Sequence, residues 1–283
     1  MLYNGDVAMD LPFQPPDERE RHVVEFLGDR VIVCGGGSSW VGPFENSCYQ
    51  LSPQCTGWLP DSRVARFQGA SSSIDGVMYS LGGYMYPKPD ELESDDSIEK
   101  FDVAKEYWTK TTLKMPNGRN GHCAVAISED EIMLLGGNPD WTDAHILNVK
   151  DGYWTKLPDS PKWTGNSGCA LTMLNGEKGV IVAGGYQSDK SAQFFNLENR
   201  TWKILPDMNI GGGLVKIATI DNTPVVFGGE LDKKVEAFDG EAWNVLEKRL
   251  PLTGDKAEVT SVSSQFADWL MSVPSIDWSK SNK

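Results

Sequence analysis

One stretch of the sequence decides the fold: residues 122–158 read HCAVAISEDEIMLLGGNPDWTDAHILNVKDGYWTKLP. Four short apolar or alternating segments, separated by polar turns, are expected to be strands: 122–127, 131–135, 144–148 and 153–157. Gly136 and Gly137 end the second segment, and Pro158, which cannot continue a central ladder, ends the fourth. Short strands joined by tight turns in this order predict an antiparallel four-stranded meander.

The same pattern returns along the chain. A glycine doublet closes an apolar run five times: Gly35 and Gly36, Gly82 and Gly83, Gly136 and Gly137, Gly184 and Gly185, and Gly228 and Gly229. A tryptophan follows each doublet: Trp58, Trp108, Trp154, Trp202 and Trp243. Successive doublets are 47, 54, 48 and 44 residues apart, which is the repeat length of a β-propeller blade. Because blades share a continuous core and no linker interrupts them, residues 1–283 are expected to form a single domain.

The doublets and tryptophans are expected to be structural. Glycine lets the second strand bend and pack where a side chain would collide with the next blade. Tryptophan fills the outer wedge between neighbouring blades, where its large area is buried. A phosphate-binding role for the doublets is disfavoured, because no GxGxxG or GxxxxGK[ST] motif occurs and no helix pattern follows them.

The joint recurrence of doublet and tryptophan over essentially the whole chain resembles the kelch repeat. The resemblance implies an all-β, kelch-type β-propeller. Arg66 and Arg119, together with Arg21, match the arginine that often precedes the first strand of a kelch blade. The fourth and fifth repeats depart from this pattern, with Trp163 and Asn209 near the matching places.

The expected number of four-stranded blades is six, since the chain length divided by the repeat length is close to six. Residues 257–262 and 266–273 resemble the first two strands of a further blade, although the glycine doublet is missing there. Residues 7–12 end in Leu-Pro, like the other fourth strands. The two termini would then share the last blade and hide an open sheet edge. The alternative is five blades with a helical C-terminal tail.

Composition limits the partners. The net charge of −14 and pI near 4.7 argue against nucleic acid, because phosphate binding needs a positive field. The residues are 40% hydrophobic and 23% charged, typical of a soluble protein, and no apolar run of about 18 residues predicts membrane insertion. Residues 1–5 lack the basic and apolar regions of a signal peptide, although a mature or trimmed form is compatible with this. The compartment, cytoplasmic or secreted, is left open.

The five cysteines do not pair obviously. Cys34, Cys123 and Cys169 lie in apolar strand contexts, which favours free buried thiols. Cys48 and Cys55 flank a turn, and a disulfide between them would indicate an oxidising compartment. Against this pair, alignment with the other repeats puts Cys55 inside the turn.

Asn199-Arg200-Thr201 matches the N-glycosylation sequon. It also matches the ordinary polar turn before a blade tryptophan, so the motif alone carries little weight.

No catalytic residue, metal site or cofactor is expected. The three histidines, His22, His122 and His145, have no zinc-type spacing, and no GxSxG elbow occurs. A few kelch-type propellers are enzymes, including a copper radical oxidase, a sialic acid epimerase and iron-dependent plant specifier proteins. None of their residue sets can be carried over to this chain. A sugar-directed enzyme of the sialic acid mutarotase or epimerase kind is the alternative function.

Aromatic residues gather in the loops after the second strands and in the loops that lead into the next blade. They are Trp40, Phe44, Tyr84, Tyr86, Trp141, Trp163 and Tyr186. Both kinds of loop open on the same side of a propeller, and Trp, Tyr and Arg are enriched at binding hot spots. The alternative is that the aromatics pack under their own loops as small satellite cores.

The resemblance to kelch propellers, most of which serve as interaction platforms, implies a non-catalytic binding module. Its partner would be a protein or peptide, with a glycan as a further candidate, held by the aromatic loops. Arg66 and Arg119 would accept acidic groups of the partner. A secreted scaffold component is a third hypothesis, for which a Cys48–Cys55 bridge would be the sign.

Overall fold

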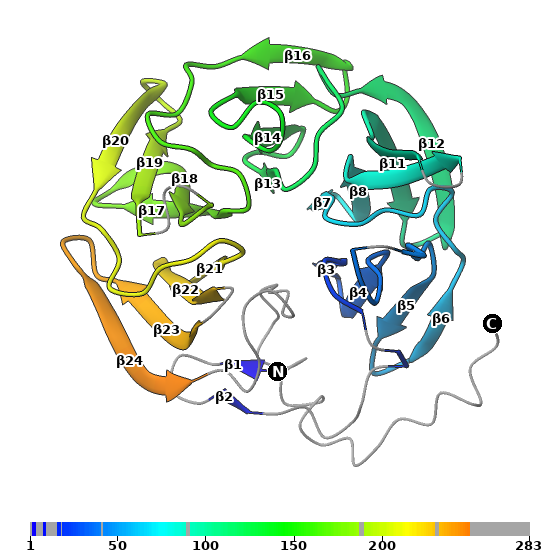
Figure 1. Ribbon diagram of the computed structural model, residues 1–283, viewed down its shortest axis with the longest axis horizontal. Helices are drawn as coiled ribbons and strands as arrows, with labels where there is room; N and C mark the ends of the chain where they lie inside the picture. Colours follow the sequence, from blue (N-terminus) through cyan, green and yellow to red (C-terminus); the bar gives the residue numbers. More distant parts are fainter. Residues whose placement is uncertain are drawn as a thin grey trace. The chain divides into compact units, whose positions relative to one another are not determined.

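The computed structural model describes residues 2–3, 8–9, 16–17, 19–40, 42–88, 91–186, 190–229 and 232–249 (Figure 1). Its elements are all β-strands, and no helix long and apolar enough to cross a membrane occurs among these residues. The contacts divide the chain into two compact units, one holding the described residues up to Gly118 and the other spanning Arg119–Val259. The single domain over residues 1–283 stays a prediction.

The first unit contains two four-stranded antiparallel sheets. One is built from β3 (Val23–Leu27), β4 (Arg30–Cys34), β5 (Cys48–Leu51) and β6 (Gly57–Leu59). The other is built from β7 (Ala70–Ile74), β8 (Val77–Leu81), β11 (Ser97–Asp102) and β12 (Tyr107–Lys114). Two hairpins accompany them, β1 (Leu2–Tyr3) with β2 (Ala8–Met9) and β9 (Tyr84–Lys88) with β10 (Glu91–Ser94).

The second unit contains three such sheets, each following the chain order (Figure 1). The first is β13 (Cys123–Ala126), β14 (Glu131–Leu135), β15 (Ala144–Asn148) and β16 (Tyr153–Lys156). The second is β17 (Gly168–Leu174), β18 (Glu177–Ala183), β19 (Ala192–Asn196) and β20 (Thr201–Leu205). The third is β21 (Lys216–Ile220), β22 (Thr223–Gly229), β23 (Asp232–Phe238) and β24 (Trp243–Arg249).

The predicted meander is confirmed, because the four strands expected between residues 122 and 158 are β13 to β16. The described residues form five four-stranded sheets, as in the five-blade alternative. Residues 257–262 and 266–273, on which a sixth blade depends, lie outside the described residues. Of residues 7–12, the described Ala8–Met9 pairs with Leu2–Tyr3, and the rest of that segment lies outside the described residues.

The hydrophobic cores lie between neighbouring sheets of each unit. In the first unit, Ile32 and Leu59 of one sheet pack with Met78 and Phe101 of the next. The second unit has two such cores, one uniting Met133, Leu135, Val180 and Phe195 and the other uniting Ile181, Phe194, Val226 and Phe238. The first strands of adjacent sheets also contact each other, β3 with β7, β13 with β17 and β17 with β21. A sheet therefore buries its apolar faces only when it has a neighbour.

Tryptophans tie adjacent sheets together at their outer strands. The indole N–H donates to the carbonyl of the proline that follows the preceding sheet's last strand: Trp108 to Pro60 at 3.0 Å, Trp202 to Pro158 at 2.9 Å and Trp243 to Pro206 at 3.0 Å. A buried indole N–H needs such an acceptor. These three tryptophans therefore lie between sheets.

The other two tryptophans of the repeat belong to the first sheet of each unit. Trp58 lies on β6 and meets the ring of Tyr49 edge-on at 6.1 Å. Trp154 lies on β16 and meets the ring of His145 edge-on, also at 6.1 Å. Each indole thus packs against the neighbouring strand of its own sheet.

The doublet Gly136 and Gly137 shows why glycine is needed there. Both residues have positive φ, +58° and +91°, a conformation that L side chains rarely adopt. A Cβ on Gly136 would lie 3.0 Å from the Cβ of Thr164, in the loop that leads into the next sheet. A Cβ on Gly137 would lie 2.7 Å from the Cβ of His122. The doublet therefore lets the end of β14 approach both loops.

The second glycine of two other doublets makes the same close approach. A Cβ on Gly36 would lie 2.6 Å from the carbonyl oxygen of Glu20, and one on Gly185 would lie 3.0 Å from that of Gly165. Each of these carbonyl groups, of Glu20 and of Gly165, belongs to the loop that precedes the glycine's own sheet. The amides of these glycines donate to the loop before the next sheet, from Gly36 to the Arg66 carbonyl at 2.7 Å and from Gly185 to the Gly212 carbonyl at 3.4 Å. Gly36 and Gly185 therefore join two loops, and a side chain at either position would push them apart.

The cysteine pairing differs from the expectation. Cys48 forms a disulfide with Cys34, which faces it in the β4–β5 ladder at a Cα–Cα distance of 4.3 Å. The β5–β6 register places Leu59 opposite Cys48, so Cys55 lies in the turn, exposed and outside any disulfide. The Cys48–Cys55 bridge, which the sequence left open, is therefore not formed, and Cys55 lies inside the turn as the alignment of the repeats indicated.

A second disulfide joins Cys123 of β13 to Cys169 of β17, with a Cα–Cα distance of 6.2 Å. It links the first strands of two neighbouring sheets, so the free buried thiols expected at Cys34, Cys123 and Cys169 are not found.

Replacing Trp108 by Phe tests the contact between sheets. Trp108 is 2% exposed, and the smaller ring leaves the Pro60 carbonyl without its donor. We expect Trp108→Phe to lower the free energy of unfolding by about 2 kcal/mol, measured by urea denaturation. The adjacent Tyr107, 55% exposed on the other face of β12, is the control. Tyr107→Phe should cost about 0.5 kcal/mol or less. Equal losses in the two variants would contradict the role assigned to the indole.

Candidate functional site

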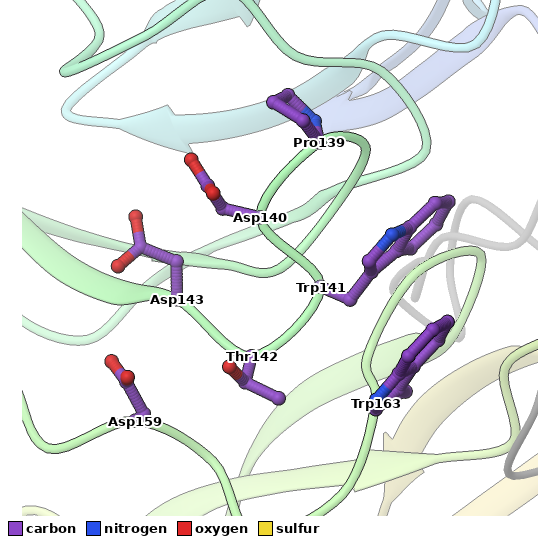
Figure 2. Close-up of a pocket in the computed structure, with 7 residues that line it drawn as sticks. All are labelled: Pro139, Asp140, Trp141, Thr142, Asp143, Asp159 and Trp163. Atoms are coloured by element: carbon purple, nitrogen blue, oxygen red, sulfur yellow. The ribbon is translucent and has the colours of Figure 1, made fainter.

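The loop aromatics form two clusters, one in each unit. The first, called the aromatic platform, consists of Trp40, Phe44, Phe67, Tyr84 and Tyr86. The second, called the indole pocket, is a cavity of about 320 Å³ lined by Pro139, Asp140, Trp141, Thr142, Asp143, Asp159 and Trp163 (Figure 2).

Phe67 is the centre of the aromatic platform and is fully buried. Phe44 stacks on it with the ring centroids 4.8 Å apart, and Tyr86 lies against the Phe44 ring at 4.8 Å. Trp40 meets Phe67 edge-on at 5.1 Å and Tyr84 at 6.0 Å. Backbone hydrogen bonds between Phe67 and Tyr84 join the loop that precedes β7 to strand β9. The platform therefore packs three loops against one another.

The members of the platform differ in what they present to solvent. Phe44 is buried, so it packs under its own loop and is not available to a partner. Trp40 remains 43% exposed, with the guanidinium carbon of Arg21 4.2 Å from its ring centroid. Tyr84 and Tyr86 are half-buried. Phe44 and Phe67 therefore form a small satellite core, whereas Trp40 presents exposed surface, and its contact with a partner stays a prediction.

Arg66 does not face solvent. It is buried, ion-paired with Asp95, and donates to the Ser97 hydroxyl at 2.7 Å. Burial alone would raise the pKa of Asp95, but the Arg66 charge and hydrogen bonds from Ser97 outweigh it and hold that pKa below its ordinary value. The guanidinium therefore fixes the loop after β8, and its expected contact with a partner is replaced by this structural role.

The same arginine contact recurs. Nη1 donates to the carbonyl of the first glycine of a doublet in three sheets: Arg19 to Gly35 at 3.1 Å, Arg66 to Gly82 at 2.9 Å and Arg119 to Gly136 at 3.0 Å. Arg19, and not Arg21, thus occupies the recurring position. The spacing of 16 residues to the doublet, common to Arg19 and Arg66, is the sequence signal that would have identified it.

The indole pocket is bounded by two tryptophans on one side and by carboxylates on the other, with Thr142 between them (Figure 2). The indoles of Trp141 and Trp163 stack with centroids 5.6 Å apart and an interplanar angle of 5°. Trp163 is 38% exposed and Trp141 is half-buried. The pair offers a flat apolar surface beside acidic groups.

Trp141 is held in place by the next loop. Its carbonyl accepts hydrogen bonds from the amide and the hydroxyl of Thr164, both at 2.8 Å. Gly165 lies directly against the benzo ring, so that any Cβ at this position would overlap the indole. Tyr186, an exposed residue, donates its amide N–H to the Gly165 carbonyl at 3.1 Å. These contacts bring Trp141, Trp163 and Tyr186 of the predicted set to adjacent loops of the second unit.

Asp143 lines the pocket and is the most heavily paired of its carboxylates. Arg119, which is fully buried, donates to it at 2.9 Å, and Lys156 donates to its other oxygen. Burial would raise the pKa of Asp143, but the hydrogen bonds from Lys156 and Arg119 hold it below its ordinary value. Burial lowers the pKa of His145, whose Nδ1 lies 3.2 Å from Asp143. Arg119, like Arg66, therefore orders a loop instead of reaching a partner.

Several residues of the two clusters carry no recognisable signal in the sequence. Phe67 directly follows Arg66, and Gly165 and Thr164 directly follow Trp163, yet none belongs to a motif. Asp140, Asp143 and Asp159 lie among polar loop residues that looked ordinary. In the part of the chain that the structure describes, no group of three or more His, Cys, Asp or Glu side chains is placed to hold a metal ion.

Replacing Gly165 by Ala tests the placement of Trp141. The added methyl group overlaps the indole, so we expect the Trp141–Trp163 stack to separate and its exciton signal in the far-ultraviolet circular dichroism to disappear. Gly213→Ala is the matched control, since a Cβ there would meet only the Tyr186 ring at 3.7 Å, an ordinary contact. An unchanged spectrum in Gly165→Ala would show that Trp141 is not held by this residue.

Known proteins resemble this chain in sequence and in fold. No protein-family profile matches it. Kelch-like protein terF of Aspergillus terreus is 28% identical over 85% of the chain and 59% of its own length. A putative F-box/kelch-repeat protein of Arabidopsis thaliana is 30% identical over 41% of the chain and 26% of its own length. Kelch domain-containing protein 10 of Xenopus tropicalis is 26% identical over 44% and 32%. The chain thus spans only part of the length of these relatives.

Among solved structures, that of YjhT superimposes with a TM-score of 0.70 over 86% of this chain and 87% of its own. The two sequences are 14% identical, so the likeness concerns the fold alone. Relatives named for kelch repeats, five four-stranded antiparallel sheets and the likeness to YjhT agree with one another: the chain has an all-β propeller fold and is similar to kelch-repeat proteins.

Proposed function

We propose that this propeller is a non-catalytic binding module whose partner, a protein or peptide, contacts the indole pocket. The observation that carries the proposal is the stacked Trp141–Trp163 pair, half-exposed and yet held in place by Thr164 and Gly165. Tryptophan is a typical hot-spot residue, and a preorganised surface loses little entropy on binding. An exposed aromatic pair without a partner would need no such support.

The surroundings of the Trp141–Trp163 pair favour a partner that carries hydrogen-bond donors. Asp140 and Asp159 present carboxylate oxygens on the other side of the pocket, where a partner's N–H or O–H groups can donate to them (Figure 2). Trp40 of the first unit is a further exposed candidate contact. Since Arg66 and Arg119 are buried, an acidic group of the partner would not reach their guanidinium groups.

A sugar-directed enzyme is the alternative, and Asp143 beside Arg119 is the kind of pair it would use. A general acid or base works best with a pKa near the working pH, and the Asp143 pKa is shifted downward, away from neutrality. Both of its oxygens are also engaged by the protein's own cations. These observations support binding over proton transfer at this position.

Affinity capture from the source tissue tests the binding function, with wild type beside Trp163→Ala and a titration of each recovered protein. We expect Trp163→Ala to weaken binding by about 30-fold or more, as for a hot spot of about 2 kcal/mol. Tyr153, 52% exposed on β16 and outside the pocket, supplies the control Tyr153→Ala, which should bind like wild type.

Equal recovery and equal affinity for wild type and Trp163→Ala would contradict the assignment of the pocket. A glycan array probed with the same three proteins identifies a sugar ligand. Binding there that depends on Trp163 would replace the protein partner by a glycan, and turnover of the bound sugar would replace the binding function by catalysis.

A further inference from the structure

The turn between β19 and β20 contains the chain's one N-glycosylation sequon, Asn199-Arg200-Thr201. All three residues are exposed. The Asn199 side-chain oxygen accepts hydrogen bonds from the Thr201 amide at 3.1 Å and the Thr201 hydroxyl at 2.5 Å. The amide nitrogen Nδ2 is therefore turned away from this contact, with the hydroxyl that an acceptor asparagine requires beside it.

The turn itself does not need Asn199. It is closed by Asn196, whose side-chain oxygen accepts from the Glu198 and Asn199 amides at 2.9 and 3.1 Å. The same contact closes the corresponding turns, where the Lys105 amide donates to the Asp102 side chain and the Asp151 amide donates to the Asn148 side chain. Lys105 and Asp151 occupy the position of Asn199 in those turns, so the fold accepts unrelated side chains there. The geometry of the turn therefore requires the side chain of Asn196 but gives no structural reason for an asparagine at position 199.

The two disulfides point to the compartment in which such modification occurs. Cys34–Cys48 lies within one sheet and joins residues 14 apart in the sequence, whereas Cys123–Cys169 lies between two sheets and joins residues 46 apart. Disulfides form and persist in the secretory pathway and outside the cell, and are rare in the cytosol. Asparagine glycosylation takes place in the same pathway.

We propose that Asn199 is an N-glycosylation site. The donor is an oligosaccharide linked to a lipid through pyrophosphate, used by an oligosaccharyl transferase. The Asn199 Nδ2 attacks the anomeric carbon, the C–N glycosidic bond forms, and the bond from that carbon to the pyrophosphate oxygen breaks. The lipid pyrophosphate leaves as the anion, and Nδ2 loses one proton to a base of the transferase.

The glycan would lie away from the indole pocket. Tyr186 belongs to the loop that precedes β19, and Asn199 to the turn that follows it. The five residues of β19 separate these two ends by about 16 Å. The glycosylated turn therefore stands at the opposite end of the sheet from the loops that carry the aromatic residues, and the modification is compatible with binding there.

Peptide mapping of the protein isolated from its source tests the proposal. Digestion with peptide N-glycosidase should increase gel mobility and convert Asn199 to Asp, and a non-reducing map should show both disulfides. An Asn199 peptide that carries no glycan before digestion would overturn the proposal. Free thiols at the four paired cysteines would overturn the argument from the compartment, and with it the proposal.

Variants of the full chain, secreted from insect cells behind a leader, test the site itself. Asn199→Asp keeps the oxygen that accepts from Thr201 and removes the nucleophilic nitrogen, so it should abolish the mobility shift without disturbing the turn. Thr201→Ala should abolish the shift, and Thr201→Ser, which keeps the hydroxyl, should retain it. A shift that persists in Asn199→Asp would place the glycan elsewhere and contradict the proposal. Partner affinity should be the same for Asn199→Asp and wild type.

Discussion

The hydrogen bond from an indole N–H to a proline carbonyl of the preceding sheet is the constraint from which the rest of the architecture follows. Each sheet buries its apolar faces only against a neighbour, so the geometry between sheets determines stability. Proline ends the outer strand and frees its carbonyl from the ladder, and the indole N–H of Trp108 or Trp243 needs an acceptor once buried. The Trp and Leu-Pro patterns of the sequence are thus the two halves of one contact.

The same packing determines where the loops lie. Gly136 brings the end of β14 against Thr164, and Thr164 in turn holds the carbonyl of Trp141. Arg119 donates to the Gly136 carbonyl and to Asp143, so a buried cation joins the doublet to the loop that lines the pocket. A residue that the repeat requires for folding therefore also orders the candidate site. This is why the arginines are buried although they precede the first strands at the loop end of the sheets.

The sequence predicted strands well because strand periodicity and turn chemistry are local properties, as the match between residues 122–158 and β13 to β16 shows. It failed where the outcome depends on the register between strands or on contacts between loops. Cys48 pairs with Cys34 because β4 and β5 place them face to face. Phe44 is buried because Phe67, 23 residues away, lies under it, and Trp141 is fixed by a glycine 24 residues away. The spacing of residues within a single repeat does not predict these contacts.

The two ends of each sheet differ in how closely the connecting segments follow the repeat in length and sequence. At one end the turns are short and are closed by an Asp or Asn side chain that accepts backbone amides, at Asp102, Asn148, Asn196 and Asp239. At the other end the loops after the second strands share only the glycine doublet, and beyond it they differ in length and sequence. A hairpin follows Gly83, whereas a short loop with Trp141 follows Gly137. Because the doublet holds the base of the loop, with an arginine bound to it in three of the sheets, the residues beyond it are free to vary without loss of the fold. Binding residues are therefore expected at this end, and the aromatic platform and the indole pocket both lie there.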